Sequence, residues 1–324
     1  MEIGFVPNRR TLKVMGIFGP SLYSGDFAMD LRTSISAVVR LPFEPEELVQ
    51  ILGRSNPSAS EDQTNEEHTT FWLVVADQFA KRGIFSDRVR EKALAIIDSG
   101  EDIATLQSLG MDAAGVRRRL KTLGDLRARI LAWHASNKLR NVLRKPQPLL
   151  MQIGDVLIYP TCDGENINPY YPSKEKNIHY TKSGPTSWIQ NGWGAMVIVD
   201  AGRAFEFLAW YRSVTLSETR DQKPSLDSLR GDLLWRLASP GTCSATHFRK
   251  MELEKIGIFP INGEKVKQEF PGLRPGISAA AQDISIANSM KSVPPGTAIP
   301  NPGGKQKWRS PTLPGIESLL QNRP

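Results

Sequence analysis

The fold is decided by three apolar runs in the middle of the chain: DVLIYP at 155–160, AMVIVD at 195–200 and AFEFLAWYRSV at 204–214. Runs this rich in β-branched and aromatic residues favour pleated, half-buried surfaces, so each run predicts a strand. The four residues DAGR at 200–203 contain a turn-compatible glycine. They predict a hairpin with a four-residue loop between the last two strands.

A polar, aromatic-rich insert, residues 161–194, separates the first two strands and contains NINPYYP at 166–172 and WIQNGWG at 188–194. One interpretation is a surface loop that covers the mouth of a small barrel. The other is a recognition loop, because loops of this length in compact domains often bind partners. Large aromatic side chains dominate interface hot spots. The candidate partner-binding residues are therefore Tyr170, Tyr171, Trp188 and Trp193, unless they plug the barrel end.

The region before the strands predicts an all-helical domain over residues 15–145. Capping signals and apolar stripes indicate helices from Asp26 to about Leu41, and over 44–52, 68–81, 87–97 and 116–131. The polar segment 56–65 reads as a loop. Pro146 and Pro148 then mark a boundary, because proline cannot continue a helix.

The region after the boundary predicts a β-rich domain over residues 149–260, with a short helix near 244–251 and a last strand near 253–260. From Pro271 onward the chain is rich in Pro, Gly and Ser, so it buries too little apolar surface to offset its ordering entropy. The expected fold class is α+β: a helical N-terminal domain, a small antiparallel barrel-like β-domain, and a flexible, largely disordered tail over 271–324.

The net charge of +7 comes from one segment. Residues 112–145 hold 10 Lys and Arg against 2 Asp and Glu, whereas residues 1–111 hold 11 against 16. Such a basic segment predicts either a nucleic-acid surface or a helix face neutralised by the acidic residues before it. The candidate nucleic-acid-binding residues are Arg117, Arg118, Arg119, Lys121, Arg127 and Arg129.

The sequence contains no apolar run of eighteen residues, so no membrane-spanning helix and no membrane partner are expected. Its first residues lack the apolar core of a secretory signal, and Met15 offers an alternative start. The two cysteines, Cys162 and Cys243, cannot form a disulfide framework. We therefore expect a cytoplasmic protein.

Catalytic signatures are sparse. Cys162, Asp163 and His179 could form a nucleophilic site only if the fold brings them within hydrogen-bond reach, so a Cys/His hydrolase is the third hypothesis. Cys243 and His247 give two soft ligands, where a zinc site needs three or four. The sequence contains no phosphate loop and no dinucleotide fingerprint. We expect no cofactor and no metal, and an enzyme is the less favoured class.

The opening of the helical domain resembles an uncharacterised family of small bacterial proteins that begin Met-Gly, continue with an aromatic-Gly pair and reach Asp-x-Ala-x-Asp. The matching residues are Met15, Gly16, Phe18, Gly19, Asp26, Ala28 and Asp30. That family has no agreed activity. The resemblance therefore assigns no catalytic residue.

The β-domain opening GDVLIYP, residues 154–160, and the later Ile256-Gly257 resemble a family of immunity proteins from bacterial polymorphic-toxin systems, whose β-domain begins Gly-Asp-Ile/Val-Phe. The resemblance spans residues 154–260 and implies that the chain binds a toxin domain without catalysing a reaction. The long insert, the helical domain and the tail depart from that family. The leading hypothesis is a non-catalytic immunity or antitoxin-like protein, and the alternative is a nucleic-acid-binding protein that uses residues 117–145.

Overall fold

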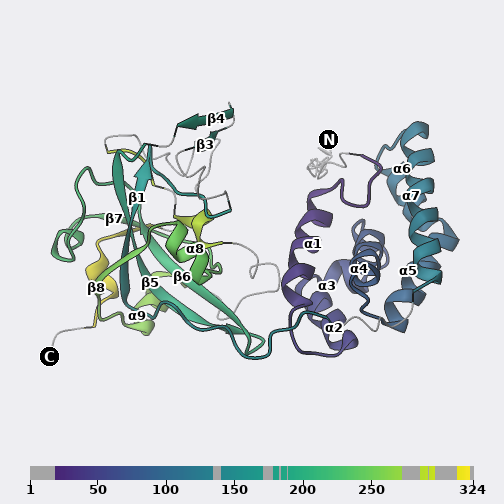
Figure 1. Ribbon diagram of the computed structural model, residues 1–324, viewed down its shortest axis with the longest axis horizontal. Coiled ribbons are helices and arrows are strands. Elements are labelled where there is room, and N and C mark those ends of the chain that lie inside the picture. Colours follow the sequence, from purple (N-terminus) through teal and green to yellow (C-terminus); the bar gives the residue numbers. More distant parts are fainter. Residues whose placement is uncertain are drawn as a thin grey trace, which may run out of the picture. The chain divides into compact units, whose positions relative to one another are not determined.

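The chain forms two compact units, one helical and one built on a sheet (Figure 1). The computed structural model describes residues 19–133, 140–170, 178–181, 184–187, 189–271, 285–290, 292–295 and 312–321. The first unit ends at Asn141, apart from the short segment Arg40–Pro42, which groups with the second unit. This division lies a few residues before Pro146.

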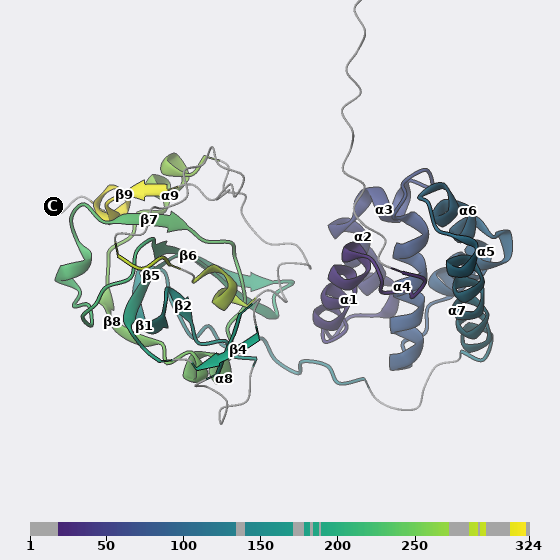
Figure 2. The same cartoon turned by 90° about the horizontal axis from the view of Figure 1, so that it is seen from above.

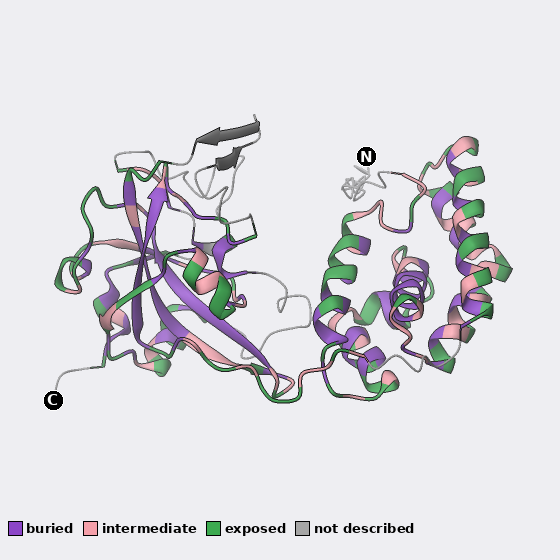
Figure 3. Cartoon of the chain, in the orientation of Figure 1, coloured by how far each residue is buried: buried purple, intermediate pink, exposed green. Residues whose placement is uncertain are grey.

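The helical unit is organised around one buried helix. Its described helices are α1 (Asp26–Val38), α2 (Pro45–Ser55), α3 (Pro57–Glu61), α4 (His68–Arg82), α5 (Asp87–Ser99), α6 (Glu101–Ser108) and α7 (Ala113–Leu131). Helix α4 contacts α1, α3, α5, α6 and α7, and Figure 3 shows it largely buried. Phe71, Trp72 and Phe79 of α4 are almost completely buried. No helix in the described part of the chain is both long enough and apolar enough to cross a membrane.

Two helices of this unit were not predicted. Helix α3 lies in the segment expected to be a loop, and it begins with Pro57, which suits a first helical position because its missing N–H needs no partner there. Helix α6 follows α5 after Gly100 alone, which takes a left-handed conformation with φ 72°. Helix α6 has only eight residues, so its apolar positions are too few to show a helical pattern in the sequence.

The second unit contains an antiparallel sheet. Its described elements are β1 (Asp155–Cys162), β2 (Glu165–Asn166), β3 (Ile178–Thr181), β4 (Gly184–Ser187), β5 (Gly192–Ala204), β6 (Leu208–Leu216), η2 (Asp227–Leu229), β7 (Leu234–Leu237), α8 (Ala245–Lys250), β8 (Glu254–Ile258), α9 (Gly263–Glu269), η4 (Ile286–Ser289), β9 (Thr312–Pro314) and η5 (Ile316–Leu319). The strand order is β2-β1-β5-β6-β7-β9, with β8 also paired to β1 and a separate β3–β4 hairpin (Figure 2). The sheet is not closed. The α+β fold class is confirmed.

Both faces of the sheet are covered, which explains why its strands read as continuous apolar runs. Along β1, Val156 and Ile158 join one buried cluster, which also holds residues of α9 and η5. Leu157 and Tyr159 point to the other face and join a second cluster, which holds residues beside α8 and in η4. Alternate side chains of one strand therefore anchor two separate cores.

The turn between β5 and β6 lies later than predicted. The segment 200–203 continues the ladder, since Asp200 pairs with Arg212 and Arg203 with Ala209 after a bulge near Ile198. The chain reverses at Phe205 and Glu206, whose φ angles of 52° and 64° are both positive. Two successive left-handed residues give the turn that matches the twist of paired strands. The turn-compatible Gly202 was therefore a misleading signal.

Three segments of the predicted tail, 271–324, pack onto the sheet unit in the described part of the chain. Residues 285–290 place Ile286 and Met290 in the second cluster, and the buried Tyr159 hydroxyl donates to the Met290 carbonyl at 2.7 Å. Residues 312–321 supply β9 and η5, and residues 292–295 bridge to Glu218. In these segments a few buried apolar residues pack onto the sheet unit, although the average composition is polar. The rest of 272–324 lies outside the described residues.

Candidate functional site

The predicted recognition insert contains more regular structure than a loop. It begins with the β1–β2 hairpin, whose tip Asp163-Gly164 has φ angles of 49° and 81°, and it includes the hairpin formed by β3 and β4. Two of the four candidate partner-binding residues, Tyr171 and Trp188, lie outside the described residues. The other two, Tyr170 and Trp193, lie within them.

Tyr170 presents an exposed ring on a fixed backbone. The residue is 57% exposed, and its ring meets His247 of α8 edge to face at a centroid distance of 4.9 Å. Its N–H donates to the Asn168 side chain at 3.0 Å, and Lys250 donates to the Pro169 carbonyl at 3.1 Å. An exposed aromatic ring that is already ordered loses little conformational entropy when a partner covers it.

Trp193 has a different position. It lies on β5 opposite Pro160, packs against the first buried cluster, and has the Lys223 ammonium 5.5 Å from its ring centroid. Tyr170 instead contacts α8, beside the second cluster on the other face of the sheet. The structure therefore does not bring these two predicted residues together. Trp193 contributes to the core, because its partly buried ring packs against the first cluster.

Sequence reasoning missed Ile189, which is the most exposed large apolar residue among those described, at 69%. It lies close in sequence to Asn191, which ties the end of the insert to the β1–β2 turn. The Asn191 amide donates to Asp163 at 2.7 Å, and the Asp163 N–H donates back to the Asn191 side chain at 2.9 Å. The sequence criterion was an aromatic side chain, which does not select an aliphatic residue such as Ile189.

The basic helix α7 is partly neutralised by carboxylates of its own unit. Arg119 pairs with Asp102 and Arg127 with Asp98, both below 3 Å, and Arg129 pairs with Asp77. The Arg119–Asp102 pair is buried and bidentate, with two N–O distances of 2.8 Å. Three of the six candidate nucleic-acid-binding residues thus form ion pairs within the helical unit.

The other three, Arg117, Arg118 and Lys121, are exposed, and no ion pair is found for them within the described part of the chain. They lie around Leu120, which is itself 53% exposed. This is a short basic patch on one helix, smaller than the surface that the sequence indicated.

The thiols give little support for nucleophilic chemistry. Burial raises the pKa of Cys243 to about 12, so its thiol stays protonated and unreactive near neutral pH. Cys162 ends β1 and pairs with Glu165 across the hairpin, and Asp163 is bound by Asn191. The side chain of His179 lies outside the described part. Among the described residues, no group of three His, Cys, Asp or Glu side chains is placed to hold a metal.

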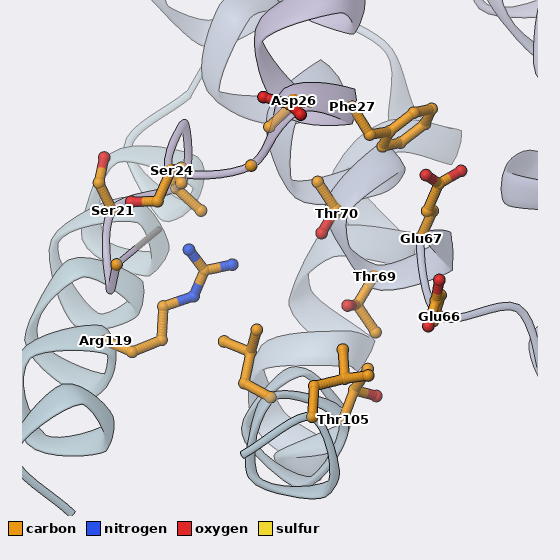
Figure 4. Close-up of a pocket in the computed structure, with 16 residues that line it drawn as sticks. Ser21, Ser24, Asp26, Phe27, Glu66, Glu67, Thr69, Thr70, Thr105 and Arg119 are labelled. Carbon is orange, nitrogen blue, oxygen red and sulfur yellow. The ribbon is translucent and has the colours of Figure 1, made fainter. Parts of the chain in front are cut away.

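A pocket lies in the helical unit, at the first turns of α1 and α4 (Figure 4). Its cavity of about 80 Å³ is several times the roughly 10–15 Å³ that admits one water molecule. Figure 4 shows the Arg119 guanidinium on one side and Glu66 and Glu67 on the other. The other polar residues of its wall are Ser21, Ser24, Asp26, Thr69, Thr70 and Thr105.

The sequence singled out four of these wall residues for other reasons. Arg119 belonged to the predicted basic face, but its side chain is buried and directed into the unit. Gly19, Asp26 and Ala28, three of the positions that carry the resemblance to the small bacterial family, line the pocket. The hydroxyl residues gave no signal, because isolated Ser and Thr at helix starts look like ordinary caps.

No protein-family model matches this sequence, and neither a curated protein nor a solved structure matches it.

Proposed function

We propose that this chain is a non-catalytic protein-binding protein of the immunity or antitoxin type, which captures and neutralises a bacterial toxin domain in the cytoplasm. The observation that carries the proposal is the exposed, pre-ordered ring of Tyr170 at the first end of the insert. Ile189 adds a second exposed apolar side chain at the other end. Large apolar side chains on anchored backbone are the usual centre of protein interfaces.

The order of this surface supports binding over catalysis. Lys250, Asn168 and Asn191 hold backbone groups of the insert through bonds of 2.9–3.1 Å. The protonated state of the buried Cys243 thiol removes one of the two possible thiol nucleophiles. A partner surface needs ordered apolar side chains, and Tyr170 at one end of the insert is such a residue.

A nucleic-acid-binding function is the weaker proposal. Phosphate binding needs several free cations on one face. Only Arg117, Arg118 and Lys121 of the six candidates are free of ion pairs among the described residues, whereas Arg119 is buried against Asp102. Three neighbouring cations support weak, salt-sensitive binding at most.

Co-expression tests the proposal. Genes adjacent to the one for this chain would be screened for a product that stops growth when produced alone, and the chain would then be produced with it. The expected result is restored growth and a complex that survives gel filtration. Growth arrest that persists with every adjacent product, while the chain is folded and abundant, contradicts the proposal. Trp193→Phe, which keeps the core aromatic, is the matched control for folding.

A further inference from the structure

Helix α7 presents a second stripe of apolar and small residues on the side that faces away from the core of the helical unit. Its inner side is buried through Leu123, Leu126 and Ile130. The exposed stripe consists of Leu120, Gly124, Ala128 and Leu131. Residues three or four positions apart lie on one face of a helix, so these four form a line roughly 16 Å long, at about 1.5 Å per residue. Leu120 and Leu131 at its ends are 53% and 49% exposed. Single exposed leucines are common, whereas an aligned apolar surface with a polar rim marks an interaction site.

Nothing within the described part of the helical unit requires a glycine at the centre of this stripe. Gly124 has ordinary helical geometry, because it lies inside α7 and its φ angle is not positive. A Cβ atom at this position would meet no atom within 4 Å. Glycine is nevertheless among the least favourable residues in a helix interior. Close approach of a second helix from outside accounts for it, because the distance between packed helices depends on the side chains at their contact.

The charges beside the stripe indicate the chemistry of the partner. Arg117, Arg118 and Lys121 are exposed, and they have no ion pair among the described residues. Asp125 is the one acidic residue within α7. Arg127, on the other flank, already pairs with Asp98. A second copy of this helix would bring like charges together, whereas the carboxylates of an acidic partner would pair with the free cations.

We propose that the outer face of α7 docks an acidic amphipathic helix of a protein partner. The apolar residues of that helix cover Leu120 and Leu131, and its backbone comes closest at Gly124. Its Asp or Glu side chains lie toward Arg118 and Lys121. Amphipathic helices commonly bind in this way, through an apolar stripe with anchors three and four residues apart. The face belongs to the helical unit, so the proposal is independent of the toxin-capturing surface proposed for the insert.

Calorimetric titration of the full chain with synthetic peptides tests the proposal. The probe is a helical peptide with leucine along one face and glutamate along the other. A scrambled isomer lacks the continuous apolar face, and a counterpart with glutamine in place of every glutamate lacks the charge. The glutamate peptide should bind saturably, with one peptide per chain. Each of the other two should bind at least about tenfold more weakly, because it loses either the apolar contact or the charge pairing.

Gly124→Gln separates docking from folding, because its two expected effects have opposite signs. Glutamine favours the helix, so the melting temperature should hold or rise, while its side chain obstructs the approach and should weaken peptide binding by about tenfold. Leu120→Ala should also weaken binding, because it removes an apolar anchor. The matched controls are Ala104→Gln, at an exposed small residue of α6, and Met29→Ala, at a residue of α1 that is 48% exposed. Both should leave binding unchanged.

The other possible occupants of this face are a second copy of the chain and nucleic acid. Sedimentation of the chain alone tests the first, and titration with duplex DNA and single-stranded RNA tests the second. A dimer that Gly124→Gln dissociates, or nucleic acid that displaces the bound peptide, would overturn the proposal. It is also overturned if the glutamate peptide does not bind, if either altered peptide binds as tightly, or if Gly124→Gln and Leu120→Ala both leave the affinity unchanged.

Discussion

The buried ion pairs inside the two units of this chain differ in how far they are shielded from water. In the helical unit, the ion pair Arg119–Asp102 has both side chains almost fully buried, at 4% and 1% exposure. In the sheet unit, the comparable pair Lys255–Asp155 joins a buried carboxylate to a lysine that is 44% exposed, and two apolar clusters fill the faces of the sheet. Both units depend on buried apolar side chains, but the helical unit should be the more sensitive to loss of a buried charge.

Removing the end of the tail should have the largest effect on the sheet unit. Truncation after residue 311 deletes β9 and four buried side chains: Leu313, Ile316, Leu319 and Leu320. At about 1.5–3 kcal/mol for each buried apolar side chain, the loss of roughly 6–12 kcal/mol approaches the whole stability of a domain. Hydrogen exchange resolved along the chain should show the sheet unit open and the helical unit protected.

A chain that ends at Gln321 is the control for this truncation, because it keeps every one of those buried side chains. It should retain full protection in the sheet unit. Equal protection in both shortened chains would contradict the assignment of the tail segment to the core.

Breaking the buried ion pair should have the next largest effect, and in the other unit. Asp102→Asn removes the charge that pairs with Arg119 and leaves an unpaired buried guanidinium, at a cost of about 3–5 kcal/mol. Asp98→Asn breaks the exposed pair with Arg127 and should change stability very little. Denaturant unfolding, monitored by hydrogen exchange in α4 and α7, compares the stability of the two variants. Similar losses in both variants would contradict the special contribution of the buried pair to the helical unit.

Acid should weaken the helical unit through Asp77. Burial acts to raise the pKa of Asp77, but hydrogen bonds from Lys81 and Tyr23 and the charges of Lys81 and Arg129 hold it below 3.8. Because the folded pKa is lower than the unfolded one, the ionised carboxylate stabilises the fold fully above about pH 4, and this stabilisation is lost as the pH falls through the folded pKa. Asp77→Asn should remove that acid-dependent loss.

The exposed Asp125 of α7 provides the control for this titration. Asp125→Asn should leave the acid-dependent loss of protection in α4 in place. If both variants titrate like the unsubstituted protein, Asp77 is not the group responsible.

The sequence predicted elements whose residues carry their own signal. The stripe of Phe71, Trp72 and Phe79 indicated α4, and the apolar runs indicated β1, β5 and β6. The sequence signal is weak where neighbours in space decide whether a residue is buried. The tail residues Ile286 and Ile316 are isolated in the sequence, and only the sheet faces that they cover make them core.

The candidate sites likewise separate into features with a local sequence signal and features that depend on neighbours in space. Its proline-rich neighbours indicated that Tyr170 lies on a loop, and its side chain is exposed. The pocket could not be predicted, because it joins Ser24, Thr69 and Arg119 from three distant parts of the chain. The charge of Arg119 suggested a surface position, whereas its partner Asp102, in the unpredicted helix α6, places it inside.

The exposed cations of α7 should contribute least to stability. Replacing Arg117, Arg118 and Lys121 together by Gln should leave both units folded, since none of them has an ion pair among the described residues. If the patch binds nucleic acid, the substitution should reduce the salt dependence of binding by up to about three units of slope, roughly one for each phosphate contact. We expect weak binding to DNA and RNA before and after the change. Tight binding at physiological salt that the substitution abolishes would reverse the order of the two functional proposals.

The most direct measurement of the central claim compares exposed residues inside and outside the insert. Tyr170→Ala and Ile189→Ala change the proposed partner surface, and Ile153→Ala changes a large apolar residue that is 50% exposed elsewhere in the same unit. Affinity for the toxin domain identified by co-expression would be measured with each folded variant, together with its melting temperature. The account predicts losses of about 2 kcal/mol or more in binding for Tyr170→Ala, a smaller loss for Ile189→Ala, and none for Ile153→Ala, with all melting temperatures nearly unchanged. Full affinity in Tyr170→Ala and Ile189→Ala would contradict it.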